Sequence, residues 1–142
     1  MRNHTLKVEL QMENEAQAGS SLDAKVVLRN VSAAPVLVNG RLLVNSQLFP
    51  GELFFAIESE NGRKFDLQVL LRTRPLTQQD FVVLDAGRSI EKTVSLKNDY
   101  GVDEPGIYTL SVTYRNEQEW SRDGQSAWVG EVSSEPVHLQ LR

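Results

Sequence analysis

The stretch Gly106-Ile107-Tyr108-Thr109-Leu110-Ser111-Val112-Thr113-Tyr114 alternates between large apolar and small polar side chains. Successive side chains of a strand point to opposite faces of a sheet. The pattern therefore predicts a strand with one face in a core and the other partly in water. Pro105 and Gly106 supply a turn immediately before it. We expect this segment to be the central strand of the fold.

The same period-two alternation recurs along the chain and is interrupted by turn residues. Further strands are predicted at 6–12, 22–29, 36–45, 53–58, 81–84, 89–97, 127–132 and 135–141. Lys92 falls on the inward side of its strand, so we expect it near the end of a sheet. No window of the chain shows a convincing helical period. Eight or nine short strands are typical of an all-β, antiparallel β-sandwich with Greek-key connections.

Turn residues in the sequence predict how the strands are connected. Asn61-Gly62 predicts a tight hairpin that returns through 63–67, and 117–126 reads as a polar hairpin loop containing Asp123-Gly124. The segment 15–21 reads as a turn, and 98–105 has room for one helical turn around Tyr100. Asn39-Gly40 has two interpretations, a hairpin turn or a bulge in one continuous strand, and the second is slightly favoured.

Composition excludes several classes of function. The 142 residues predict one domain spanning 1–142, and the absence of cysteine rules out disulfides and thiol catalysis. The net charge of -4 argues against nucleic acid as a partner. No apolar run is long enough for a membrane span, and no signal peptide precedes the first strand. We expect a soluble protein, either cytoplasmic or exported with its signal removed, and its oligomeric state stays open.

The turn and strand residues resemble a known group of domains. Leu84-x-Ala86-Gly87-x-Ser89 and Pro105-Gly106-x-Tyr108-x-Leu110 are similar to the second half of many bacterial Ig-like domains. Val26-x-Leu28-x-Asn30-Val31-Ser32 is similar to their first half. The group includes the non-catalytic Ig-like domain associated with deuterolysin-type metallopeptidases, and bacterial intracellular proteinase inhibitors look similar.

The resemblance implies a fold and only weakly a function. It implies an Ig-like sandwich in which Tyr108 bonds back to the backbone as a tyrosine corner. The chain has no His-Glu-x-x-His zinc motif, so no peptidase activity carries over. The resemblance covers most of the chain but supplies no set of inhibitory residues.

The residues that could carry chemistry are few. His4 and His138 are the two histidines, and both lie on terminal segments expected to be peripheral. No Gly-x-Ser-x-Gly motif and no phosphate-binding glycine loop are present. Asp99, Asp103 and Glu104 share one loop, but their spacing matches no calcium-binding pattern. We expect no enzyme activity, no catalytic residues, no cofactor and no metal.

Candidate contact residues lie in the loops. Trp120 is the best single candidate, because a tryptophan in a polar loop can stack on a sugar or anchor a protein, whereas Trp128 is expected in the core. The other candidates are loop residues that could form an apolar patch or a charged rim: Arg122, Leu70, Leu71, Arg72, Arg74, Leu48 and Phe49. Alternatively, the leucines could cover the open edge of a sheet.

These observations leave three hypotheses of function. The preferred one is a non-enzymatic Ig-like module that binds a protein partner through its loops or a sheet edge. The second is a peptidase-associated or peptidase-inhibitor domain, suggested by the resemblance alone. The third is a carbohydrate-binding sandwich that uses Trp120.

Overall fold

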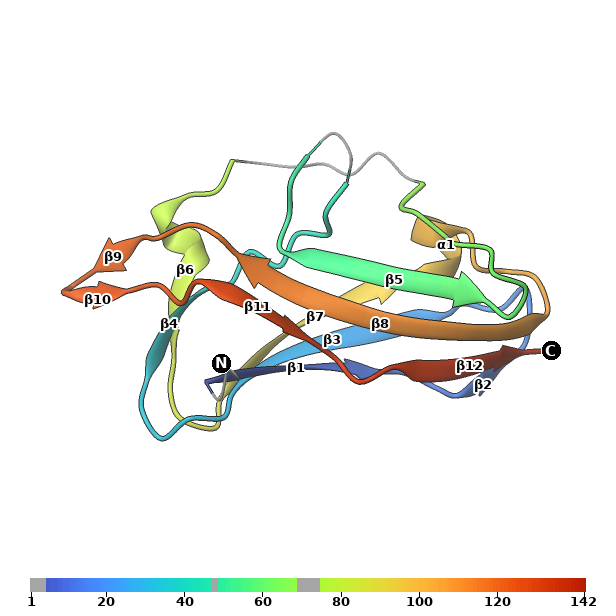
Figure 1. The fold of residues 1–142 in the computed structure, drawn as a ribbon, viewed down its shortest axis with the longest axis horizontal. Helices are drawn as coiled ribbons and strands as arrows, with labels where there is room; N and C mark the ends of the chain where they lie inside the picture. The colour runs from blue at the N-terminus through green and yellow to red at the C-terminus, as the bar shows by residue number, and fades with distance from the viewer. Residues whose placement is uncertain (1–4, 47–48, 69–74) are drawn as a thin grey trace.

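The computed structural model describes residues 5–46, 49–68 and 75–142. Within these ranges the chain forms twelve strands, one short α-helix and one 3-10 turn, which confirms the all-β class (Figure 1). The strand count exceeds the predicted eight or nine because turn segments contribute strands of only two residues. These short strands are β2 (Glu15–Ala16), β9 (Ser121–Arg122) and β10 (Gln125–Ser126).

One antiparallel sheet has the order β1-β3-β7. Its strands are β1 (Leu6–Gln11), β3 (Asp23–Asn30) and β7 (Ser89–Ser95). Val8 lies opposite Leu28, and Ala24 lies opposite Val94, so apolar residues of neighbouring strands share the inner face. The alternating residues of β1 and β3 therefore bury one side of this sheet, as predicted.

The second sheet is organised around the alternating strand that follows Pro105. β8 (Gly106–Asn116) pairs antiparallel with β5 (Leu53–Ser59), β11 (Gly130–Ser133) and β12 (Val137–Leu141). β2 adds to β12 in parallel. The alternating apolar set of β8 is buried throughout: Tyr108, Leu110, Val112 and Tyr114. The central position of this strand is confirmed.

The two sheets face each other and enclose the main core (Figure 1). Val26 and Leu28 of β3 join Leu110 and Val112 of β8 and Leu139 of β12 in one cluster. The Tyr108 hydroxyl donates a 2.6 Å hydrogen bond to the Glu104 carbonyl, four residues upstream. Trp128 is half-buried and stacks on Tyr114 with ring centroids 5.8 Å apart, so its predicted packing role is confirmed.

A smaller unit extends the fold at one end. β4 (Val36–Asn39) pairs with β6 (Phe81–Leu84), and the β9–β10 hairpin lies beside them at the left of Figure 1. Leu37, Phe81 and Ala127 form a second buried cluster there. Asp123 and Gly124 have positive φ angles of 52° and 79°, as a two-residue hairpin turn requires.

Neither interpretation of 36–45 is correct. β4 ends at Asn39, the following residues are irregular, and Val44 makes only an isolated parallel bridge to Leu53. Gly40 does not form a turn. It allows neighbouring segments to pack closely, because a methyl group at this position would lie only 3.1 Å from the Val82 side chain. The predicted hairpin at Asn61-Gly62 turns as expected, but its second arm contributes a single bridge, Glu58 to Lys64.

The prediction for Lys92 and the end of its strand needs correction. Lys92 is exposed in the middle of β7, which is one of the two edge strands of its sheet. β7 stops at Ser95, and Leu96 begins α1 (Leu96–Tyr100), which contains the predicted helical turn. The Ser95 hydroxyl accepts a hydrogen bond from the Asn98 amide, which caps the helix and explains the early end of the strand.

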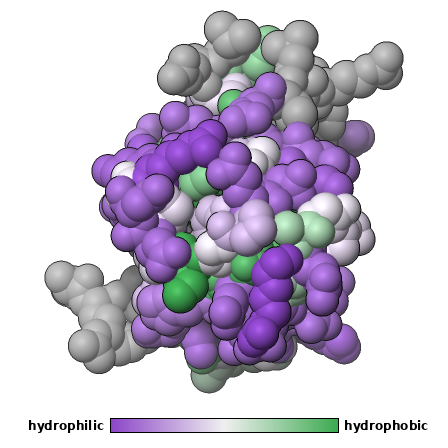
Figure 2. All heavy atoms as spheres, turned by 90° about the vertical axis from the view of Figure 1, so that its right-hand side faces the viewer, coloured by the Kyte–Doolittle hydropathy of each residue, from purple (hydrophilic) through white to green (hydrophobic). Residues whose placement is uncertain are grey.

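The end of the molecule opposite the β9–β10 hairpin is covered mainly by hydrophilic side chains, with only small hydrophobic spots (Figure 2). No helix in the part of the chain that the structure describes is long and apolar enough to cross a membrane.

Candidate functional site

A groove of about 850 Å³ lies at the hairpin end of the second sheet. It is lined by described residues of three segments: 41–45 with 49–54, which reaches the start of β5; 75–81, which leads into β6; and 115–120, which continues from the end of β8. We call this feature the groove. Its size falls in the range typical of ligand-binding pockets.

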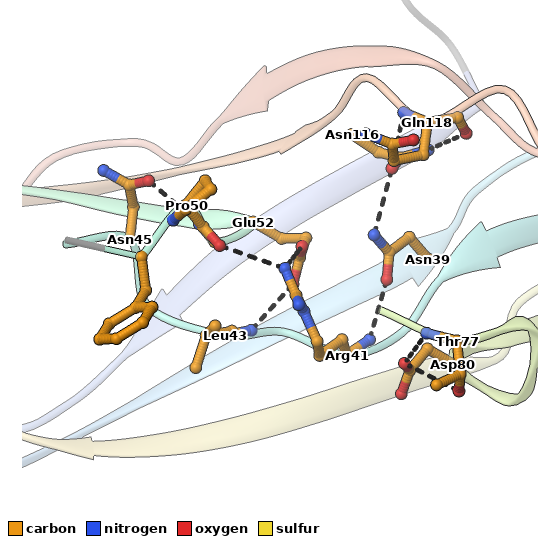
Figure 3. Close-up of polar contacts among 12 residues, drawn as sticks. Asn39, Arg41, Leu43, Asn45, Pro50, Glu52, Thr77, Asp80, Asn116 and Gln118 are labelled. Carbon is orange, nitrogen blue, oxygen red and sulfur yellow. Dashed lines mark hydrogen bonds and ion pairs between the residues drawn. The ribbon is translucent and has the colours of Figure 1, made fainter. Parts of the chain in front are cut away.

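A buried ion pair holds the 41–52 wall in place (Figure 3). The Arg41 guanidinium donates to both oxygens of the Glu52 carboxylate, at 3.0 Å from Nε and 2.6 Å from Nη2. The same nitrogen Nη2 donates to the Pro50 carbonyl at 3.2 Å, and the Leu43 amide donates to the Glu52 carboxylate at 3.0 Å. This bidentate pair therefore ties Arg41 and Leu43 to Pro50 and Glu52 across the wall.

A pair of buried asparagines joins this wall to the end of the central strand (Figure 3). The Asn39 side chain donates to the Asn116 side-chain oxygen at 3.1 Å and accepts from the Arg41 amide at 3.2 Å. Asn116 also donates to the Trp128 carbonyl at 2.7 Å. Burial, with a smaller contribution from the Glu52 carboxylate, raises the pKa of the neighbouring Tyr114 well above its usual value.

The 75–81 wall is braced in a similar way. Asp80 is buried, and its carboxylate accepts hydrogen bonds from the Thr77 amide at 2.9 Å and the Thr77 hydroxyl at 3.3 Å (Figure 3). The Asp80 carbonyl accepts from the Gly40 amide at 2.8 Å. These bonds close the 3-10 turn η1 (Gln78–Asp80) and tie it to the residue that follows β4.

Aromatic side chains from all three segments reach the groove. Trp120 is half-buried and lies against Phe81, with ring centroids 5.3 Å apart and planes inclined by 31°. The Arg115 guanidinium sits 4.9 Å from the centre of the Phe54 ring. Phe49 is 41% exposed. Amide and carboxylate side chains of the same segments also line the groove: Asn45, Gln78, Gln118, Glu117 and Glu119.

The structure places two of the predicted contact residues together. Trp120 and Phe49 both line the groove although 71 positions separate them (120 − 49). Arg122 lies in β9, and its side chain is outside the described part of the structure. The remaining predicted residues lie outside the described ranges: Leu48, Leu70, Leu71, Arg72 and Arg74.

Sequence reasoning missed the polar frame of the groove. Arg41, Glu52, Gln78 and Asn116 belong to separate segments and share no motif spacing. Phe54 is the groove residue that the sequence could most readily have indicated. It follows the buried Leu53 in a strand, so its side chain points to the opposite face of the sheet, away from the core.

The described residues that were considered for chemistry do not line the groove. His138 is exposed on β12, 3.3 Å from the Thr109 hydroxyl, and His4 lies outside the described residues. Asp103 accepts a hydrogen bond from the Gly19 amide at 2.9 Å. Among the described residues no group of three or more histidine, aspartate or glutamate side chains could hold a metal ion. No protein-family model matches this chain, and a search of curated proteins finds no match.

Proposed function

We propose that this chain is a non-enzymatic binding module with an Ig-like, Greek-key arrangement of strands, and that its ligand occupies the groove. The Tyr108 bond to the Glu104 carbonyl supports the Ig-like assignment, because a tyrosine at this place in such folds bonds to the backbone just upstream. Strands distant in the chain are neighbours, β3 with β7 and β5 with β8, as Greek-key connections require.

The observation that carries the proposal is the combination of rigid walls with accessible aromatic surface. The buried Arg41–Glu52 pair and the Asn39–Asn116 contact hold the walls through bonds within the protein. Trp120 and Phe49 keep part of their surface in solvent. A preorganised site loses little conformational entropy on binding, and aromatic anchors supply much of the binding energy.

The lining favours binding over catalysis. None of the described lining residues is a histidine, and the buried Glu52 carboxylate is already occupied by Arg41. Among the described lining residues there is also no serine or cysteine, so no nucleophile–base pair of the Ser–His or Cys–His kind is present. The peptidase-associated alternative rests on the resemblance alone.

Screening by ligand class tests the proposal. Wild-type protein and the Trp120→Ala and Ile107→Ala variants would each be applied to a displayed peptide library and to a glycan array. Ile107 is a matched apolar control, because it is 45% exposed at the opposite end of β8. We expect ligands that bind the wild type and Ile107→Ala but not Trp120→Ala.

Failure to select any ligand, or ligands indifferent to Trp120→Ala, would overturn the groove as the binding site. Chemical turnover of a bound compound by the purified protein would contradict the non-enzymatic assignment.

A further inference from the structure

The charges that line the groove are largely neutralised within the protein. Arg41 is paired with Glu52. Arg115 lies 3.4 Å from the Glu131 carboxylate and 3.8 Å from that of Glu117. Glu119 makes no ion pair with any other described residue. Among the described residues, the groove therefore has no surplus positive charge with which to attract an anionic ligand.

The backbone amide and carbonyl groups at the start of β5, beside the groove, already make hydrogen bonds within the protein. The Leu53 amide donates to the Leu43 carbonyl at 3.0 Å, and the Leu53 carbonyl accepts from the Asn45 amide at 2.8 Å. The Glu52 carbonyl accepts from the Arg115 amide at 2.8 Å. A peptide added as a further strand would need these groups for its hydrogen bonds, so β-strand addition is disfavoured here.

Besides the Glu119 carboxylate, the described groups left for a ligand are a flat ring and uncharged side chains that both donate and accept hydrogen bonds. Phe81 supports one face of Trp120, which leaves the indole as a fixed platform in the groove. Gln78 and Gln118 are exposed at its rim, and each amide offers a donor and an acceptor. A matching ligand combines flat C–H faces with many hydroxyl groups.

Resting on the proposed function, we infer that the groove binds a neutral oligosaccharide, with one pyranose ring stacked on Trp120 and ring hydroxyls bonded to Gln78 and Gln118. Rings with equatorial substituents have the flat faces that such a platform requires. The 850 Å³ volume lies near the upper end of the range for ligand pockets, which favours several linked sugar rings over a single one.

Tryptophan fluorescence gives a direct test, because the chain has only two tryptophans. The Trp128→Phe variant keeps Trp120 as its only indole. It would be titrated with β-1,4-linked hexamers of glucose, xylose, mannose and N-acetylglucosamine, and with a galacturonic acid hexamer as the charged control. We expect a saturable change in Trp120 emission with at least one neutral hexamer and no change with the charged one.

Side-chain variants separate sugar recognition from a folding defect. Gln78→Ala and Gln118→Ala should each weaken binding by about tenfold, measured by calorimetry. Gln140→Ala is the matched control, since Gln140 is exposed on β12 away from the groove, and should bind as the wild type does. Tight binding retained in both groove variants would overturn the assignment of these two residues and with it the inference.

The results also distinguish a wrong ligand class from a wrong proposed function. If no neutral hexamer binds but a displayed peptide binds in a Trp120-dependent manner, the oligosaccharide inference is wrong and the binding function stands. If neither class binds, both are wrong. Preferential binding of the charged hexamer would overturn the inference as well, because the groove would then attract anions.

Discussion

The Tyr114 hydroxyl donates a buried 2.7 Å hydrogen bond to the Asn39 carbonyl oxygen, 75 positions earlier in the chain. This contact joins the central strand β8 to the last residue of β4. The Asn39 side chain in turn donates a hydrogen bond to the Asn116 side chain and accepts one from the Arg41 amide. The bond therefore connects the alternating strand that organises the core to the polar frame of the groove.

Removing that hydroxyl should destabilise the protein. Tyr114→Phe leaves the Asn39 carbonyl without this donor inside the protein, and we expect a loss of about 1–3 kcal/mol in the free energy of unfolding. Tyr108→Phe is a matched control whose bond to the Glu104 carbonyl is only part-buried, so its loss should be smaller. Urea unfolding measures both, and an equal or larger loss for Tyr108→Phe would contradict the structure.

Breaking the buried ion pair should cost more than removing it entirely. Glu52→Ala removes the buried carboxylate that balances the Arg41 charge and accepts from the Leu43 amide, and we expect it to lower the free energy of unfolding by about 3–5 kcal/mol. The double variant Arg41→Met with Glu52→Leu removes both charges and should be more stable than Glu52→Ala. Thermal unfolding compares the two proteins, and a double variant that is less stable than Glu52→Ala would contradict the expected cost of leaving one charge unbalanced.

Two glycines should respond differently to the same substitution. A methyl group at Gly51 would lie 2.3 Å from the Leu43 carbonyl oxygen, so Gly51→Ala should displace the 41–52 wall and cost about 1–3 kcal/mol or more. Gly62 has a φ of +89° but open space around it, and Gly62→Ala should cost about 1 kcal/mol.

Ligand binding distinguishes the two glycine variants further. Gly51→Ala should reduce binding in the groove, whereas Gly62→Ala should leave it unchanged because its turn lies at the other end of β5. Unaltered binding and stability in Gly51→Ala would mean that the wall is less tightly packed than the structure indicates.

The tyrosines should make the protein sensitive to alkali. Burial raises the pKa of Tyr100 and Tyr114 above the usual value, with nearby carboxylates adding to the effect. An unfolded tyrosine has a pKa of about 10, so above that pH the folded state binds more protons than the unfolded chain. Stability should be unaffected by these groups below about pH 10 and fall by about 1.4 kcal/mol per pH unit for each group above it.

Phenolate absorbance checks the alkaline prediction. We expect it to appear together with loss of the β-type circular dichroism signal as pH rises. Tyr100→Phe should reduce the pH dependence, because one of the shifted groups is gone. Titration of all the tyrosines near pH 10 while the protein remains folded would show that they are not buried as described.

Local patterns predicted much of the fold. The alternation in β1 and β8 identified their buried faces correctly, and Asp123-Gly124 identified the β9–β10 turn. Each of these features depends on residues adjacent in the chain. Asn39-Gly40 shows where such reasoning fails, because the contacts of Gly40 with Val82 and Asp80, rather than its turn propensity, decide its role.

Asn30 shows the difference between what the local sequence reveals and what only the tertiary structure reveals. Its sequence context matches a glycosylation sequon, yet the side chain is fully buried and donates to the Ala34 and Leu84 carbonyls, both at 2.8 Å. The Leu84 contact spans 54 positions, so no local pattern could reveal it. The structure uses this asparagine to satisfy backbone groups at the corner between β3 and β4.

By itself the sequence determined the all-β class, the buried faces of the main strands and the position of the central one, because strand alternation is a property of neighbouring residues. Only the tertiary structure decided that Arg41, Glu52, Trp120 and Gln78 surround one groove. Their convergence depends on strand pairings between distant segments, and those pairings are set by packing of the whole core rather than by any local preference.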